Sequence, residues 1–455
     1  MDKSAYMKWG VNILIPILIF LVPVNDIFTM QMKLFLVITV ASILLYAFEQ
    51  INSMFVSLLM PFAWFMSGVA PLSVGFSGWV SDVPYLAISV WMFSNVLTEI
   101  GLLQRIAYSI CAKAGSFKSL IILLVIAGMI ITLLTFGVGY ILVAALALGI
   151  CQALDIKPGK TMTAIGFAVI IGAVSSRVYI YSPVMLALLI SNGKSILGDT
   201  FDITPFTQMG QLWPLVLSAI VCIWFILKFY GQGENINTKE YFREKLQQMG
   251  PLSKAEKKGI IVLVILIAGV LLQPLHGIST SLILIIIPWL CFIPGIAIGS
   301  DGAVKRVPYE TVFFMVGCFG IGSVAVTTGI GEAISSAVMP LLNGGSVFTT
   351  LGIVIALVSV LNFLMTPLAI MAAITMPLTQ LALDLNLNPM LFMWAIFVGC
   401  DVVIMPYEYA VYLIIYGFGM MNLKEFIKLN ALRSLVMIAC FFIVLIPYWY
   451  LIGLI

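Results

Sequence analysis

The sequence predicts an all-α polytopic membrane protein, because of its hydropathy and of paired interruptions in its apolar segments. Of its 455 residues, 62% are hydrophobic and 9% are charged, and the mean hydropathy is +1.16. Soluble proteins average roughly 45–50% apolar and about 25% charged residues. Four apolar segments are interrupted in the middle, two in each half of the chain. We therefore expect about 11 transmembrane helices in two inverted repeats, each with a re-entrant hairpin and a discontinuous helix.

Two apolar stretches predict the hairpins. Residues 119–152 and 346–382 are too short to cross the hydrocarbon twice, since one crossing needs about 20 residues. Each is broken near its midpoint, the first at Thr135–Gly139 and the second at Met365–Pro367. This pattern is typical of a re-entrant hairpin that reaches halfway into the membrane.

Two longer stretches predict the discontinuous helices. Residues 161–192 are interrupted from Ser175 to Pro183, and residues 389–421 from Asp401 to Glu408. An offset of 226 residues places the segment 181–190 on 407–416. A broken helix persists in a bilayer only where its freed backbone groups are buried in protein or line a cavity. Corresponding breaks in two halves are typical of a secondary transporter with its substrate site at the midplane.

The remaining spans and the domains follow from the same length criterion. The other spans are expected near residues 10–27, 32–49, 54–72, 84–103, 207–229, 259–275, 278–297, 309–331 and 431–453. We predict N-terminal scaffold helices (1–118), a first transport half (119–230), a helix-favouring cytoplasmic linker (231–258), second scaffold helices (259–345) and a second transport half (346–455). Interfacial helices are expected at 102–113 and 331–342, where polarity is mixed.

Basic residues orient the chain, because cytoplasmic loops are enriched in Lys and Arg. An N-terminus in the cytoplasm and a C-terminus outside leave only Lys33 and Lys194 outside and Arg177 within a membrane segment, out of 22 Lys and Arg residues. Arg433 is counted on the cytoplasmic side. The first apolar segment lacks a small-residue cleavage site and is interpreted as a retained span. The predicted location is a bacterial-type inner membrane.

Three ionisable residues lie in the breaks, where a charge costs about 2.5–3.5 kcal/mol on insertion scales. Arg177 either binds an anionic substrate through a carboxylate or forms an ion pair with Glu408 or Asp401 that ties the two broken helices together. Glu408 and Asp401 are the candidates for binding a coupling ion, with a proton on Glu408 as the leading hypothesis. The alternative for Glu408 is that it forms an ion pair with Arg177 and binds no proton.

Half-helix N-termini at the breaks offer N–H groups to an anion. For each Ser or Thr the alternative is a hydrogen bond within its own helix, and for each Tyr it is packing. Together with Arg177 and Glu408, the residues predicted to line a substrate site are Thr135, Gly137, Gly139, Ser175, Ser176, Tyr181, Ser182, Thr366 and Tyr407.

Other classes of function find little support. Phosphate loops, Cys/His metal spacings and nucleophile elbows are not found, and the seven scattered cysteines are expected to be buried free thiols. No enzyme activity, cofactor, metal or nucleic-acid partner is therefore expected. An ion channel or an intramembrane enzyme remains the alternative from a different class.

The layout of span, interfacial helix, hairpin and broken helix, repeated twice, resembles the divalent anion/sodium symporter family of di- and tricarboxylate transporters. The segments Met249–Lys258 and Met420–Asn430 are similar to its central-loop signature and to the lead into its last helix. The resemblance implies an elevator-like transporter of small organic anions, namely di- or tricarboxylates, that forms a homodimer with a static scaffold.

The sequence departs from that family at the sodium motifs. The family carries Ser-Asn-Thr at each hairpin tip, whereas the tips here are Thr135–Gly139 and Met365–Leu368. Its Thr-Pro-Pro-Asn stretches are reduced to Tyr181–Val184 and Tyr407–Ala410. We therefore expect sodium-independent exchange or proton coupling, with sodium symport as the alternative.

Overall fold

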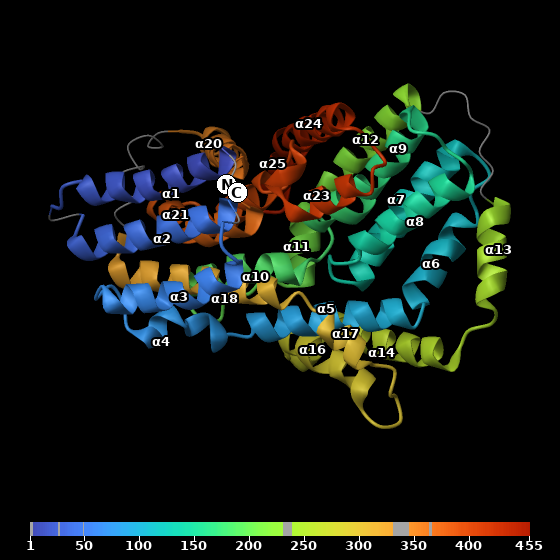
Figure 1. Ribbon diagram of the computed structural model, residues 1–455, viewed down its shortest axis with the longest axis horizontal. Helices are drawn as coiled ribbons and strands as arrows, with labels where there is room; N and C mark the ends of the chain where they lie inside the picture. Colours follow the sequence, from blue (N-terminus) through green and yellow to red (C-terminus); the bar gives the residue numbers. More distant parts are fainter. Residues whose placement is uncertain (1–2, 26–27, 49, 231–238, 331–344, 364–365) are drawn as a thin grey trace.

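The computed structural model describes residues 3–25, 28–48, 50–230, 239–330, 345–363 and 366–455, and all regular secondary structure in these ranges is helical (Figure 1). The prediction of an all-α protein is confirmed. The first half contains α1 Lys3–Leu21, α2 Met30–Phe48, α3 Ser53–Met66, α4 Leu72–Gly75, α5 Val83–Glu99, α6 Leu102–Cys111, α7 Phe117–Leu134, α8 Tyr140–Ala153, α9 Lys160–Val169, α10 Pro183–Leu197, α11 Pro205–Leu212 and α12 Val216–Phe229. The linker and second half contain α13 Lys239–Met249, α14 Lys254–Leu271, α15 Gln273–His276, α16 Thr280–Ile286, α17 Asp301–Lys305, α18 Tyr309–Thr328, α20 Val347–Asn362, α21 Pro367–Asp384, α22 Pro389–Gly399, α23 Ala410–Gly417, α24 Leu423–Cys440 and α25 Ile446–Leu451.

Several helical runs are long and apolar enough to cross a membrane. Within the described residues there are five: Phe117–Leu134, Lys160–Leu197, Pro205–Phe229, Pro367–Asp384 and Leu423–Leu451. The bent pair of α5 and α6 adds a sixth if it counts as one span. Further apolar helices of 10–17 residues include Tyr309–Ala325 within α18, and the helices α20 and α22. The predicted number of about 11 spans therefore includes helices shorter than the usual 20 residues.

Both predicted hairpins are present. The first joins α7 to α8 across Thr135–Gly139, where Phe136 and Gly137 have positive φ angles of 52° and 97°. The second joins α20 to α21, and its tip lies partly outside the described residues. The 18-residue arms α7 and α21 are each about 27 Å long at 1.5 Å per residue, longer than the half-membrane reach that the sequence predicts.

Both predicted helix breaks are also present. After α9 the chain forms a π-helical turn (η2, Ile170–Val174) and a 3₁₀ turn (η3, Ser175–Val178), and it is not helical again until Pro183. After α22 it is irregular from Cys400 to Met405 and then forms the 3₁₀ turn η6 (Pro406–Glu408) before α23.

The hairpins pack on the broken helices in a symmetrical way. α7 contacts η2 while α20 contacts α22, and α8 contacts α23 while α21 contacts α10. Glycine makes the first contacts close: a Cβ on Gly172 would lie 2.6 Å from the Val125 carbonyl oxygen, and one on Gly128 would lie 2.8 Å from the Gly172 carbonyl carbon. In the second half a Cβ on Gly399 would lie 2.8 Å from Cβ of Val358. Each hairpin therefore contacts its own broken helix backbone to backbone or nearly so.

The helix α6 leaves α5 at an angle of 66°, at Gly101, which adopts a left-handed conformation with φ of 81°. It buries Leu102, Leu103, Ala107 and Cys111 on one face, as expected of an interfacial helix. Its counterpart at 331–342 lies outside the described residues. The linker helix α13 confirms the predicted helical tendency of residues 239–249.

Arg105 on α6 binds the end of the linker through hydrogen bonds. Arg105 Nε donates to the Glu256 carboxylate at 2.5 Å, and its Nη1 and Nη2 donate to the carbonyls of Gly250 and Met249 at 2.9 and 3.2 Å. Glu256 also accepts from the Ser253 N–H and so forms a capping box at the start of α14.

This contact predicts a pH-dependent contribution to stability. The hydrogen bond from Arg105 lowers the pKa of Glu256 below its ordinary value of 4.5. A carboxyl with a lowered pKa in the folded state stabilises that state at pH values above the unfolded pKa, and the contribution is lost as pH falls through the folded pKa. Glu256→Gln is therefore expected to unfold more easily than wild type at pH 7 and to approach it below pH 4.5. Thermal unfolding in detergent across this range measures the effect, with Glu244→Gln on the exposed face of α13 as control. If Glu256→Gln unfolds at a lower temperature than wild type by the same amount at every pH, the lowered pKa of Glu256 is contradicted.

Candidate functional site

The first break is held by Gln208 of α11, which is fully buried. Its Nε2 donates to the carbonyls of Arg177, Val178 and Ile180 at 2.9, 3.0 and 3.2 Å. Its Oε1 accepts from the Ser182 N–H at 3.0 Å. One amide thus satisfies four backbone groups that the interruption frees, which a buried break requires.

The second break is held by three side chains. Asn362, at the end of α20, donates to the carbonyls of Gly399 and Val402 at 2.8 and 3.0 Å. Arg433 of α24 donates to the Asp401 carbonyl at 2.6 Å, and Ser434 donates to the Val403 carbonyl at 3.3 Å.

The predicted offset relates the two breaks. Gln208 and the Arg177 carbonyl correspond, after a shift of 226 residues, to Ser434 and the Val403 carbonyl. The same hydrogen bond is therefore made in both halves, and the sequence repeat is a structural repeat.

A buried ion pair lies where the two broken helices meet. Arg433 Nη1 donates both to the Asp401 carboxylate and to Ser175 Oγ, the latter at 2.7 Å. Arg433 and Asp401 are 1% and 8% exposed. Ser175 and Asp401 are related by the 226-residue offset, so one guanidinium binds equivalent positions of both repeats. The placement of Arg433 on the cytoplasmic side is wrong, because its side chain lies in the protein interior and binds both breaks.

Arg177 is buried at 6% exposure but forms no ion pair with a carboxylate of the described residues. Its Nη1 donates to the Tyr409 hydroxyl at 3.0 Å, its Nε donates to the Val174 carbonyl at 2.9 Å, and its guanidinium lies 5.1 Å from the centre of the Tyr409 ring. The alternative in which Arg177 pairs with Glu408 or Asp401 is not what the structure shows.

A cavity of about 20 Å³ separates the two broken helices. This volume holds about one water molecule. In this form the cavity is therefore too small to hold an organic molecule. The residues that line the cavity are Arg177, Val178, Met185, Phe397, Cys400, Asp401 and Tyr409.

Glu408 caps its own turn. Its carboxylate accepts from the N–H groups of Ile404 and Met405 at 3.1 and 2.8 Å. The side chain of Tyr407 lies outside the described residues.

The other predicted residues surround the breaks without lining this cavity. Thr135 and Ser176 hydrogen-bond within their own helices, to the carbonyls of Ile131 and Gly172, each at 2.6 Å. Thr366 caps α21. Gly137 brings the first hairpin tip against the break, since a Cβ there would lie 2.8 Å from Ser182 Oγ and 3.3 Å from Cδ of Arg177. A Cβ on Gly139 would meet Ile131 and Thr135 instead.

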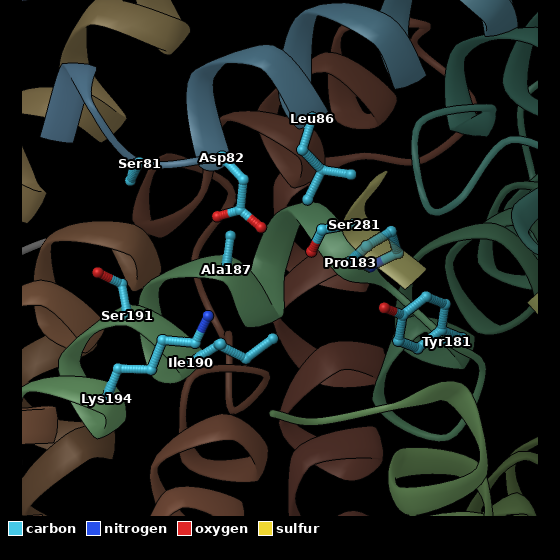
Figure 2. A pocket seen from close by; sticks show the side chains of 10 residues that line it. All are labelled: Ser81, Asp82, Leu86, Tyr181, Pro183, Ala187, Ile190, Ser191, Lys194 and Ser281. Atoms are coloured by element: carbon cyan, nitrogen blue, oxygen red, sulfur yellow. The ribbon is translucent and has the colours of Figure 1, made fainter. Parts of the chain in front are cut away.

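Tyr181 faces a separate pocket of about 310 Å³ between α5, α10 and α16 (Figure 2). Asp82, at the start of α5, and Lys194, on α10, both point into it. A third cavity, of about 390 Å³, lies where α9 and α24 begin and includes Lys160 and Asn422. The two larger cavities thus lie toward opposite ends of the broken helix 160–197, with the break between them.

Three comparisons with known proteins agree on the class of protein. The model of the citrate transporter family matches residues 43–399. The uncharacterized transporters MT2759 and Rv2685 of two Mycobacterium tuberculosis strains are each 22% identical to the chain over 338 residues, which is 70% of this chain and 73% of theirs. The structure is similar to that of the Alcanivorax borkumensis YdaH transporter, which is described as having an unusual topology. The TM-score is 0.57 at 17% identity, over 84% of this chain and 88% of that one.

The structural similarity supports the fold, and the family match covers the greater part of the sequence. Together with the apolar helices they make this chain a multi-pass membrane protein and a transporter rather than an enzyme. The chain belongs to the citrate transporter family.

Proposed function

We propose that this secondary transporter carries small organic anions, namely di- or tricarboxylates, and that Arg177 binds a substrate carboxylate. The observation that carries the proposal is a buried guanidinium that has no carboxylate partner among the described residues and lines a cavity between the two repeats. A buried cation of this kind favours an anionic ligand. The citrate transporter family supports the same substrate class.

Alternating access is supported by the cavities. The central cavity is too small for a substrate, whereas the two larger ones lie toward either end of the first broken helix. In the orientation with a cytoplasmic N-terminus, the pocket with Asp82 and Lys194 opens outside and the one with Lys160 opens inside. The elevator-like motion, the scaffold and transport halves, the homodimer and the inner-membrane location stay predictions.

Uptake into proteoliposomes tests the role of Arg177. With radiolabelled citrate or succinate, Arg177→Gln is expected to lower uptake at least about 30-fold, since truncating a buried charged contact costs about 2 kcal/mol or more. Arg177→Lys keeps the charge without the bidentate geometry and is expected to retain part of the activity. Arg243→Gln, on the exposed face of α13, is the control. Wild-type uptake and affinity in Arg177→Gln would contradict the proposal.

The same assay separates the alternatives. A carrier saturates and shows counterflow, a channel shows neither, and an enzyme alters its substrate. We propose that uptake does not require sodium, and uptake that stops without sodium would favour sodium symport instead.

Glu408 and Asp401 are the proposed sites of the coupling proton. Glu408 is buried at 2% exposure and forms no ion pair with a described basic residue, so a proton on it removes a buried charge that has no ion-pair partner. Glu408→Gln is expected to reduce the stimulation of uptake by an acidic outside pH. Stimulation of wild-type size in this variant would exclude Glu408 as a proton carrier.

A further inference from the structure

Arg433 is held in place by contacts that do not involve the Asp401 carboxylate. Its Nη2 donates to the Asp401 carbonyl at 2.6 Å, and its Nε donates to Asn430 Oδ1 at 3.3 Å, one turn earlier on α24. The remaining nitrogen, Nη1, bonds to the Asp401 carboxylate and to Ser175 Oγ. If the carboxylate left, the guanidinium and the hydroxyl would stay and would form a site for another carboxylate.

The Asp401 side chain bonds to this guanidinium and also borders the cavity. Asp401 lines the cavity together with Arg177, whereas Arg433 does not. Asp401 belongs to the irregular segment between α22 and η6, so its carboxylate can turn away without disrupting a helix. The Tyr412 hydroxyl, which donates to Asp401 Oδ1 at 3.1 Å, is its other partner.

We propose that Arg433 Nη1 and Ser175 Oγ form a second anion subsite, which Asp401 occupies in the form described here and which a second carboxylate of the substrate takes over. The inference rests on the proposed function, since Arg177 supplies the first subsite. It names the substrate class: an anion with at least two carboxylates, one for each guanidinium. A monocarboxylate would fill only the Arg177 subsite, and Asp401 would remain the partner of Arg433.

In the loaded site, two guanidinium groups face two substrate carboxylates. In the empty site the same two guanidinium groups are balanced by Asp401 and Glu408. The charged and titratable groups near Asp401 are Arg433 from α24, Arg177 and Tyr179 from the first break, Tyr412 from α23 and the adjacent Cys400. Arg433 is the charged group near Glu408.

The first test is chemical rescue of purified protein in detergent. Asp401→Ala empties the subsite, so its thermal unfolding temperature is expected to be below that of wild type and to rise toward it as choline acetate is added. Choline chloride at equal ionic strength is expected to have no such effect, and wild type is expected to respond to neither salt specifically. Asp401→Ala combined with Arg433→Met is expected to lose the acetate response. Because this measurement needs no transport, it does not depend on the proposed function, and an Asp401→Ala variant insensitive to acetate overturns the subsite.

The second test keeps Asp401 and serves also if Asp401→Ala does not fold. Binding of succinate is compared with that of its monoamide, which has the same size and one charge less. Wild type is expected to bind succinate at least about tenfold more tightly than the monoamide. Ser175→Ala is expected to weaken the binding of succinate about tenfold without affecting that of the monoamide, as the loss of one hydrogen bond to a charged group implies. Arg177→Gln is expected to weaken the binding of both ligands. Equal affinities for the two ligands, each dependent on Arg177, overturn the second subsite and leave the proposed function standing. Affinities that do not depend on Arg177 count against the proposed function itself.

Discussion

Arg433→Met is expected to lower the free energy of unfolding by about 3–5 kcal/mol, because it leaves the Asp401 carboxylate buried without its cation. Asp401 is 8% exposed, and its remaining side-chain partner is the neutral Tyr412 hydroxyl. Denaturant unfolding in mixed micelles measures the loss.

A double variant separates the charge from the packing. Arg433→Met with Asp401→Asn removes both charges, and it is expected to be more stable than Arg433→Met alone, since no unpaired carboxylate remains. Arg243→Met, on the exposed face of α13, controls for the loss of an arginine as such. If the loss of unfolding free energy in the double variant equals the sum of the losses in Arg433→Met and Asp401→Asn, the two charges do not interact. The structure's ion pair is then contradicted.

Gln208→Leu is expected to destabilise the protein by about 4 kcal/mol and to abolish anion uptake. The variant leaves three carbonyls and one N–H of the first break without their partner, and each buried unsatisfied group costs about 1–3 kcal/mol. Uptake is lost because the backbone that carries Arg177 is no longer held. Both quantities are measured on the same preparations, by thermal unfolding and by proteoliposome uptake.

Two variants show whether the amide itself is responsible. Gln208→Glu keeps an oxygen that accepts from the Ser182 N–H but loses the Nε2 donor to three carbonyls, so it is expected to resemble Gln208→Leu. Gln152→Leu, at the exposed end of α8, is expected to behave as wild type. A stable Gln208→Leu variant with full uptake would show that water replaces the amide and that Gln208 does not position the break.

The sequence predicted the breaks because Pro, Gly and charged residues inside apolar segments are local features. The partners of the breaks were not predicted, because they come from helices far away in the chain. Gln208 lies in a segment interpreted as an ordinary span. Arg433 follows the basic stretch Lys424–Lys428, and counting charges placed it with those residues at the membrane surface.

Two signals in the sequence point to the missed residues. Asn430, Arg433 and Ser434 are three and four residues apart and therefore share one face of a helix, which is unusual for a span otherwise made of apolar residues. The 226-residue offset that aligns the breaks also aligns Gln208 with Ser434. By contrast, no sequence pattern distinguishes Arg433 from Arg177 as the partner of Asp401, since both lie near it and only the packing of α24 against the breaks decides.

The glycine contacts between α7 and the first broken helix have a mechanical consequence. Where main chain touches main chain across Gly128 and Gly172, no flexible side chains lie between the two surfaces to absorb a displacement. A slide of one past the other would drive carbonyl groups into each other, so the hairpin and the broken helix are expected to move together. If the proposed alternating access involves a shear, it must then occur at another interface, such as the contacts of α10 with α5 and α18.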